Sequence, residues 1–199
     1  MNRGKRGGSV VRITAGRWKG RRLEVPVGAR PTSGRARQAF FNILQETIHG
    51  ASVLDLYAGS GAVGLEAVSR GAARVVLVER NARALERNVE RLRPREGEVR
   101  VLRTDVEKAI DTLTRRGDRF DIVFSDPPYE VPLETGLVPS IVALTAPGGL
   151  LVLQRDAPGE SVQEPEGLTL IRRRHYGRNV FYFFAAAATY WEVLRPEGP

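Results

Sequence analysis

Apolar residues follow two different spacings along this chain. Short and nearly continuous apolar runs occur at residues 52–57, 74–78, 99–102, 120–124 and 149–153. Between them, apolar residues recur every three or four positions over longer stretches. The runs are typical of buried strands, and the longer stretches are typical of amphipathic helices. Strands that alternate with helices in this way predict an α/β fold, in which a mostly parallel sheet carries helices on both faces.

Polar residues and glycines mark where the predicted helices begin and end. Thr32 or Ser33 can cap a first helix, whose apolar face continues to Thr47. Asn81 and Asp105 stand at the start of two later helices. The remaining predicted helices cover residues 61–70, which Gly71 ends, and residues 137–144.

Two β-hairpins are predicted outside this alternation. Residues 10–15 and 21–25 are short β-type runs, joined by a link with a glycine at each end. Residues 168–173 and 180–184 flank a second turn and are expected to close the sheet with antiparallel pairing. The predicted organisation is a disordered basic tail (1–8), a β-hairpin extension (9–30), the α/β domain (31–184) and a C-terminal extension without an assigned role (185–199).

The composition excludes several kinds of site. The 199 residues include no cysteine, which rules out disulfides, thiolate nucleophiles and cysteine metal ligands. His49 and His175 lie far apart in the sequence, so no metal site is expected. No apolar run is long enough to span a membrane and no signal peptide is visible, so we expect a cytoplasmic protein.

Positive charge is concentrated near the N-terminus. The formal net charge is +8, and residues 1–37 contain eleven Lys or Arg residues but a single acid, Glu24. This distribution favours a polyanion such as nucleic acid as partner, with a solvated arginine-rich tail as the alternative. Trp18 either anchors the hairpin or offers a ring on which a base can stack. Arg35 and Arg37 fall in the first turn of a helix, where they oppose the helix dipole unless an anion binds there.

Acidic residues follow three successive predicted strands. Asp55 ends the first and precedes Gly59 and Gly61, which allow a ligand to approach the backbone near a helix N-terminus. Glu79 ends the second strand and can hold both hydroxyls of a ribose. Asp105 ends the third and can accept a hydrogen bond from an adenine amino group. These strand ends share one edge of a parallel sheet, where α/β folds bind ligands.

Residues 59–64 also match the dinucleotide-binding pattern G-x-G-x-x-G, with Glu79 at a suitable distance. A nicotinamide-dependent oxidoreductase is therefore an alternative. Asp55 argues against it, because a carboxylate beside the glycines repels a pyrophosphate but accepts the ammonium of an amino acid.

The loop after the fourth strand reads Asp126-Pro127-Pro128-Tyr129. Its prolines fix the backbone and remove two N–H donors, so the loop presents hydrogen-bond acceptors beside an aromatic ring. Such a loop suits a flat group that carries an NH2, whereas a stiff turn is the purely structural alternative. It has no role in hydride transfer.

Together these motifs resemble a known family. Asp55-x-x-x-Gly59-x-Gly61, followed by Asp126-Pro127-Pro128-Tyr129, is similar to the S-adenosylmethionine-dependent amino methyltransferases. The segment RITAGRWKGRRL at 12–23, with residues 30–33, 41–44, 65–72 and the Tyr176-Gly177 turn, resembles the RsmD family of bacterial 16S ribosomal RNA guanine-N2 methyltransferases. The resemblance runs from about Val11 to Phe184. Gln154 departs from it, because the family usually has an acidic residue after the fifth strand.

The resemblance implies a Rossmann-like class I methyltransferase sheet with S-adenosylmethionine as cofactor. The implied cofactor-binding residues are Asp55, Ala58, Gly59, Gly61, Glu79, Asp105, Val106 and Asp126, and the implied catalytic residues are Asp126, Pro127 and Tyr129. The RNA-binding candidates are Arg12, Arg17, Trp18, Lys19, Arg21, Arg22, Arg30, Arg35, Arg37, Tyr176 and Arg178. The implied partner is small-subunit ribosomal RNA, free or within a ribosomal subunit, bound by a monomer. Methylation of adenine N6 or cytosine N4 in DNA remains an alternative, as does a non-catalytic RNA-binding assembly factor.

Overall fold

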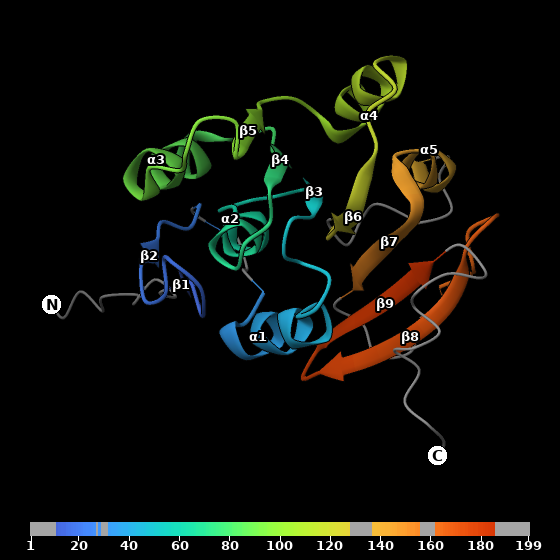
Figure 1. Ribbon diagram of the computed structural model, residues 1–199, viewed down its shortest axis with the longest axis horizontal. Helices are drawn as coiled ribbons and strands as arrows, with labels where there is room; N and C mark the ends of the chain where they lie inside the picture. Colours follow the sequence, from blue (N-terminus) through green and yellow to red (C-terminus); the bar gives the residue numbers. More distant parts are fainter. Residues whose placement is uncertain (1–10, 27, 29–31, 128–136, 156–161, 186–199) are drawn as a thin grey trace, which may run out of the picture.

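The computed structural model describes residues 11–26, 28, 32–127, 137–155 and 162–185. They form a seven-stranded sheet and a separate two-stranded hairpin (Figure 1). The large sheet has the strand order β5-β4-β3-β6-β7-β9-β8, and all its neighbours are parallel except the two pairs that β9 makes. Its strands are β3 (Ser52–Leu56), β4 (Arg74–Val78), β5 (Val99–Leu102), β6 (Phe120–Ser125), β7 (Thr145–Arg155), β8 (Thr169–Tyr176) and β9 (Asn179–Ala185).

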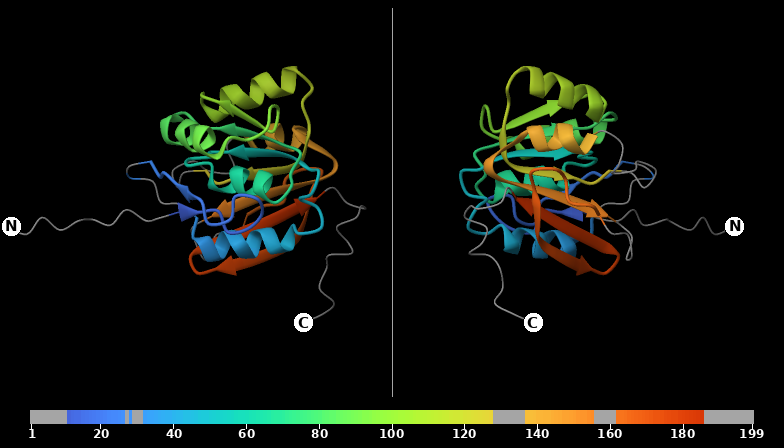
Figure 2. Two further views of the ribbon diagram at one scale, coloured as in Figure 1. Left: turned by 60° about the vertical axis from the view of Figure 1, so that its left-hand side comes forward. Right: turned by 90° about the vertical axis from the view of Figure 1, so that its right-hand side faces the viewer.

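Helices cover both faces of this sheet (Figures 1 and 2). One face carries α1 (Gly34–Ile43), α2 (Ala62–Ser69) and α3 (Arg83–Leu92), and the other carries α4 (Val106–Arg115) and α5 (Leu137–Ala143). Each face has its own apolar core. Phe40, Leu65 and Leu85 belong to the first core, and Ile110 and Ile141 belong to the second. The predicted α/β fold with a C-terminal antiparallel hairpin is confirmed.

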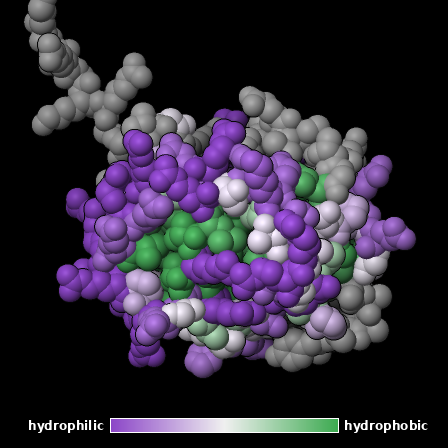
Figure 3. All heavy atoms as spheres, turned by 90° about the horizontal axis from the view of Figure 1, so that it is seen from above, coloured by the Kyte–Doolittle hydropathy of each residue, from purple (hydrophilic) through white to green (hydrophobic). Residues whose placement is uncertain are grey.

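The sheet ends at β5 on one side and at β8 on the other. β5 lies at the top of Figure 1, and the view from that side shows an apolar area among hydrophilic side chains (Figure 3). Val99, Val101 and Leu102 of this edge strand are half-buried. With only four residues, β5 offers little length for pairing with another strand.

Some local boundaries differ from the prediction. Ser33 caps α1, and its Oγ accepts a hydrogen bond from the Ala36 backbone N–H at 3.1 Å. The helix expected to start at Asn81 begins at Arg83, because the Asn81 backbone N–H is bonded to the Glu79 side chain at 2.9 Å in the preceding turn. The predicted tail (1–8) and residues 186–199 of the predicted C-terminal extension lie outside the described residues.

The N-terminal extension packs against the α/β domain. Its strands β1 (Val11–Arg12) and β2 (Arg22–Leu23) are antiparallel, and its apolar side chains join the core under α1 and α2. Ser69, at the end of α2, fastens the link between these strands. Its carbonyl accepts from the Arg17 backbone N–H at 2.9 Å, and its hydroxyl accepts from the Trp18 backbone N–H at 2.9 Å and donates to the Ala15 carbonyl at 2.6 Å.

Trp18 is the apolar anchor of this extension. Its side chain is only 7% exposed, and the Arg17 guanidinium lies over its ring, 4.3 Å from the centroid. A ring that is buried and covered in this way has no face to offer a base. The hairpin-anchor interpretation of Trp18 therefore holds, and its assignment as an RNA contact is wrong for this conformation.

Arg37 is also not an RNA contact in this structure. Its side chain is 1% exposed, and its Nε donates to the carboxylate of the completely buried Glu66 at 2.6 Å. The guanidinium donates further to the carbonyls of Thr32, at 3.3 Å, and of Arg12. The helix dipole argument failed because a buried acid on α2, rather than an external anion, compensates this charge.

None of the helices in the described part of the chain is long and apolar enough to cross a membrane.

We expect Arg37→Met to lower the free energy of unfolding by about 3 kcal/mol, because it leaves a buried carboxylate with one partner fewer. Denaturation in urea measures this loss. Arg35→Met, an exposed position in the same helix, is the matched control and should change stability by less than about 0.5 kcal/mol. Equal stability of the two variants would contradict a structural role for Arg37.

Candidate active site

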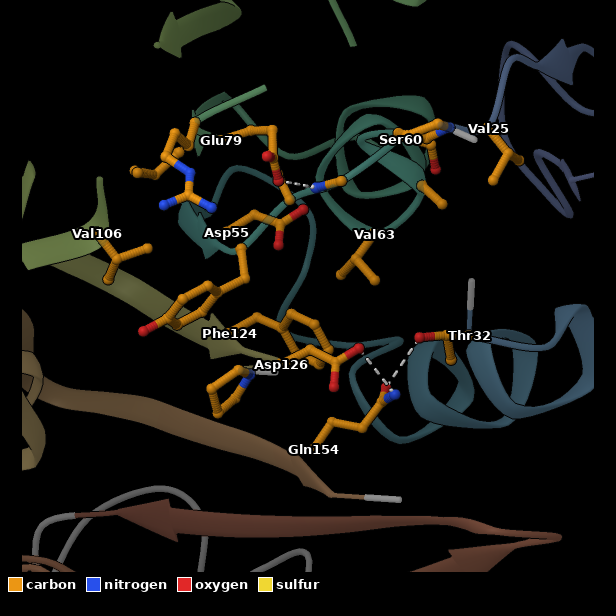
Figure 4. Close-up of a pocket in the computed structure, with 18 of the residues that line it drawn as sticks. Val25, Thr32, Asp55, Ser60, Val63, Glu79, Val106, Phe124, Asp126 and Gln154 are labelled. Atoms are coloured by element: carbon orange, nitrogen blue, oxygen red, sulfur yellow. Dashed lines mark hydrogen bonds between the residues drawn. The ribbon is translucent and has the colours of Figure 1, made fainter. Parts of the chain in front are cut away.

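A cavity of about 1080 Å³ opens at the carboxyl ends of the central parallel strands. Its wall is completed by residues that follow β2, by the start of α1 and by the turn between β8 and β9. Asp55, Glu79 and Asp126 face this cavity from three successive positions in the sheet (Figure 4). The sheet topology therefore brings together the acids that the sequence placed at separate strand ends.

Asp55 is the most deeply buried of these acids. Its side chain is 1% exposed, and its carboxylate accepts a hydrogen bond from the Gly64 backbone N–H at 2.8 Å. Burial raises the pKa of Asp55 to about 7, and the nearby carboxylates of Asp126 and Glu79 add to the increase. The Gly64 hydrogen bond acts in the opposite direction. A cation that enters the cavity would therefore stabilise the ionised form of Asp55.

Glu79 shapes the glycine loop. Its Oε2 accepts from the Gly59 backbone N–H and its Oε1 from the Asn81 backbone N–H, both at 2.9 Å. Gly59 has a φ of +56°, a conformation that glycine adopts without strain. A carboxylate can accept about four hydrogen bonds, so Glu79 retains capacity for the hydroxyls of a ligand.

Gly61 serves packing and does not line the cavity. It has a φ of +77°, and a Cβ at this position would lie 2.4 Å from the Leu85 Cδ1. The packing requirement alone accounts for glycine at this position, and the contact expected between its backbone and a ligand stays a prediction. Ala58, by contrast, lines the cavity as expected.

Asn88, which the sequence analysis did not identify, stabilises the glycine loop from the side of α3. It is fully buried on α3, and its Nδ2 donates to the carbonyls of Ser60 and Glu24, both at 2.9 Å. Its Oδ1 accepts from the Glu24 backbone N–H at 2.8 Å. An asparagine spaced three and four residues from Leu85 and Leu92, on the apolar face of a helix, was the signal that could have found it.

Asp105 and Val106 line the cavity beyond β5. Asp105 is half-buried, and its carboxylate lies 3.6 Å from the exposed Arg80 guanidinium. Tyr57 also lines this region with a φ of 60°, which is uncommon for a residue other than glycine. Burial raises the pKa of its hydroxyl, which is buried and has no hydrogen-bond partner among the described residues. A buried donor of this kind fits a cavity that receives a polar ligand.

Asp126 and Pro127 lie in the wall beyond β6. The Asp126 Oδ2 accepts from the Gln154 Nε2 at 3.0 Å, and Gln154 is held in turn by Thr32 (Figure 4). Pro128 and Tyr129, which the sequence assigned to the same loop, lie outside the described residues.

The remaining RNA-binding candidates are distributed over two places. Tyr176 and Arg178 line the cavity from the β8–β9 turn. Arg17 pairs with Glu98, and this hydrogen bond holds the pKa of the Glu98 carboxyl below its ordinary value. The candidates on the extension and α1 that lie at exposed positions are Arg12, Arg17, Lys19, Arg21, Arg22 and Arg35, whereas Arg30 lies outside the described residues.

These groups fit S-adenosylmethionine. Its methionine end carries an ammonium and a sulfonium, which suit the acid-lined wall formed by Asp55, Glu79 and Asp126. The Glu79 carboxylate would hold the ribose hydroxyls, and Asp105 with Val106 would flank the adenine. The cavity exceeds the volume that one drug-sized ligand usually occupies, which leaves room for a base beside the cofactor. Among the described residues, no group of His, Cys, Asp and Glu could hold a metal ion.

Comparisons with known proteins agree with this assignment. A family model described as Conserved hypothetical protein 95 matches residues 11–185. Ribosomal RNA small subunit methyltransferase D of Escherichia coli is 38% identical over 148 residues, which are 73% of this chain and 71% of that protein. Putative rRNA methyltransferase YlbH of Bacillus subtilis is 31% identical over 173 residues, 84% of this chain and 94% of that protein. The solved structure of the putative methyltransferase yhhF from Escherichia coli has a TM-score of 0.76 and 33% identity, and the match covers 91% of this chain and all of that one.

The fold, the acid-lined glycine loop and these relatives define an S-adenosylmethionine-dependent methyltransferase. The chain belongs to the family described as Conserved hypothetical protein 95, which is the RsmD family that the sequence motifs resembled.

We expect the pH dependence of stability to reveal Asp55 in the ligand-free protein. Below about pH 3 the carboxyl is protonated in both the folded and the unfolded chain. As pH rises toward about 7, only the unfolded chain loses this proton, so the free energy of unfolding falls by at most about 1.4 kcal/mol per pH unit. Urea denaturation across this range measures the slope.

Asp55→Asn removes this contribution. The free energy of unfolding of the variant should therefore rise relative to that of wild type from pH 4 to pH 7. Glu46→Gln, at an exposed position after α1, is the control. Parallel stability curves for wild type and Asp55→Asn would show that Asp55 keeps an ordinary pKa.

Proposed function

We propose that this protein transfers a methyl group from S-adenosylmethionine to the exocyclic N2 amine of a guanine in small-subunit (16S) ribosomal RNA. The observation that carries the proposal is the placement of Asp126 in the same cavity as Asp55 and Glu79. A carboxylate that can hold an amine thus shares one space with the residues that suit the cofactor. The names of the curated relatives support ribosomal RNA as the substrate.

The bound cofactor supplies an electrophilic methyl group on a sulfonium. The exocyclic amine of guanine is a poor nucleophile, because its lone pair is delocalised into the ring. When the Asp126 carboxylate and the Pro127 carbonyl accept its two N–H groups, the nitrogen can pyramidalise and direct its lone pair at the methyl carbon. A bound S-adenosylmethionine would supply the methyl group and leave as a neutral thioether, and the positive charge would pass to the nitrogen that these acceptors hold.

Asp126 stabilises the charge that develops on this nitrogen, and the nitrogen then releases a proton. A preorganised interaction of this kind contributes roughly 10²–10³ in rate. Because the proton leaves after methyl transfer, Asp126 acts as an anion. Tyr129 is assigned to stack on the base, a contact worth roughly 1–3 kcal/mol.

The RNA has to present the guanine outside its stack, since a paired base cannot enter a cavity. The exposed cations of the extension, with Arg35 and Arg178, are proposed to hold the phosphates around that base. The extension continues into Val25 and Pro26, which line the cavity, so its cations lie on a segment that leads to the reaction site. We propose that the protein acts as a monomer in the cytoplasm, on RNA that is free or part of a ribosomal subunit.

Labelled S-adenosylmethionine offered with total RNA, DNA and isolated small ribosomal subunits tests this function. Label in 16S ribosomal RNA, recovered as N2-methylguanine by mass spectrometry, is the expected result. Label in adenine or cytosine of DNA would instead assign an amino methyltransferase of DNA. Cofactor binding without label in any nucleic acid would favour a non-catalytic assembly factor.

Asp126→Ala should abolish methyl transfer while S-adenosylmethionine still binds, because Asp55 and Glu79 remain in the acidic wall that receives the cofactor. Calorimetry measures the binding and label incorporation measures the transfer. Asp121→Ala, at the other end of the same strand, is the control and should keep activity. Near-normal turnover by Asp126→Ala would remove the role assigned to this loop.

The exposed arginines of the hairpin should contribute to RNA affinity through counterion release. In Arg21→Ala/Arg22→Ala, the slope of log affinity against log salt should fall by about 0.7 per lost phosphate contact on single-stranded RNA. Filter binding at several salt concentrations gives this slope. Arg119→Ala, exposed at the edge of the sheet opposite the cavity, is the control, and identical slopes for all three proteins would place the RNA elsewhere.

A further inference from the structure

Gln154 lies at the meeting point of three parts of the site. It belongs to β7 and is only 3% exposed. Its Nε2 donates to the Asp126 Oδ2 at 3.0 Å and lies 3.2 Å from the Asn179 Oδ1. Its Oε1 accepts from the Thr32 hydroxyl at 3.1 Å. Figure 4 shows Asp126 and Thr32 on either side of this amide.

Chemistry fixes the orientation of this amide. An ionised carboxylate only accepts hydrogen bonds, so the NH2 of Gln154 has to face Asp126. The oxygen of the amide is then left for the Thr32 hydroxyl, which has a hydrogen to donate. Because both ends of the amide are engaged, the carboxylate of Asp126 is held by a side chain that cannot turn freely.

We propose that Gln154 is a positioning residue, which fixes the Asp126 carboxylate in the orientation that the methyl acceptor amine requires. This inference rests on the proposed function of Asp126. Gln154 is part of the cavity wall, and the role assigned to it acts through Asp126.

The two anchors of Gln154 extend its role to the RNA. Thr32 directly precedes the capping residue of α1, whose first turn carries Arg35. Asn179 directly follows Arg178 in the β8–β9 turn. Two of the elements proposed to hold RNA therefore each contact Gln154. RNA that binds to them would also restrict the movement of the amide that orients Asp126.

The neutral amide also matters for charge. A glutamate at position 154 would put a second carboxylate against Asp126 and would raise the pKa of Asp126 through like-charge repulsion. Asp126 already shares the cavity with other ionisable groups from every strand end and turn around it, namely Asp55, Tyr57, Glu79, Arg80, Asp105, Glu107, Tyr176 and Arg178. Gln154 adds a hydrogen-bond donor to this set without adding a charge.

The test compares methyl transfer by wild type, Gln154→Leu and Gln154→Glu at saturating cofactor over a range of pH. For Gln154→Leu, we expect kcat to fall on the order of tenfold to a hundredfold, as a misplaced reacting group does, with little change in cofactor affinity or in KM for RNA. For Gln154→Glu, we expect the acidic limb of the pH–rate profile to move to higher pH by about one unit or more. A residue with a merely structural role would move neither kcat alone nor the pH profile.

Thr32→Val, alone and combined with Gln154→Leu, gives a second measurement that does not depend on one variant. Its loss of kcat should be smaller, and the two losses should not add, because both changes release the same carboxylate. Thermal unfolding of each variant verifies folding, and Gln163→Leu, an exposed glutamine, is the matched control.

The outcomes separate this inference from the proposed function. If wild type transfers no methyl group to RNA, the proposed function fails. If wild type is active and Gln154→Leu retains its kcat, or Gln154→Glu retains the wild-type pH profile, Gln154 does not position Asp126. Additive losses for Thr32→Val and Gln154→Leu would likewise overturn the inference.

Discussion

The completely buried carboxylate of Glu66 has to be neutralised within the fold, because an unpaired charge in a dry interior costs several kcal/mol. Its partners are Arg37 from α1, Arg70 from the end of α2 and the Thr14 hydroxyl from the extension. Segments that are far apart in the sequence thereby meet on one helix. The same helix follows directly after the glycine loop. The ion pairs and hydrogen bonds of Glu66, which attach the N-terminal extension, therefore also support the wall of the cofactor cavity.

The parts of the fold that the sequence predicted are those that depend on local pattern and on sheet topology. Apolar spacing located the strands, and parallel pairing alone then brought Asp55, Glu79 and Asp126 to one edge. Arg37 was misjudged because an arginine in a first turn has the same local pattern whether it faces solvent or a buried acid. Its partner lies 29 residues further along the chain, and the only trace of it is one glutamate within helix α2, which carries no other charged residue. The sequence marked Gln154 only as a departure from the family, because the residues next to it in the sequence do not indicate contact with Thr32 or Asn179.

The molecule separates two opposite charge environments. The chain as a whole is strongly positive, yet the cavity at its centre is lined by carboxylates. A cationic cofactor and a polyanionic substrate are therefore each attracted to a different part of the same surface. This arrangement limits direct entry of phosphates into the acidic cavity, whereas an uncharged base can enter it. In the proposed function, the outer cations would hold the RNA backbone, and the inner acids would act on the amine of the base that enters the cavity.

The position of β9 has a consequence for how the chain is made. Although β9 is the last strand of the described residues, it lies inside the sheet, with β7 on one side and β8 on the other. Phe181 and Phe183 from this strand also pack against Phe40 of α1, near the beginning of the domain. Neither β7 nor β8 can complete its pairing before residues 179–185 have been synthesised. A growing chain therefore exposes the open edge of β7 until nearly the whole domain has been translated, a period in which an unpaired strand is open to association with other chains.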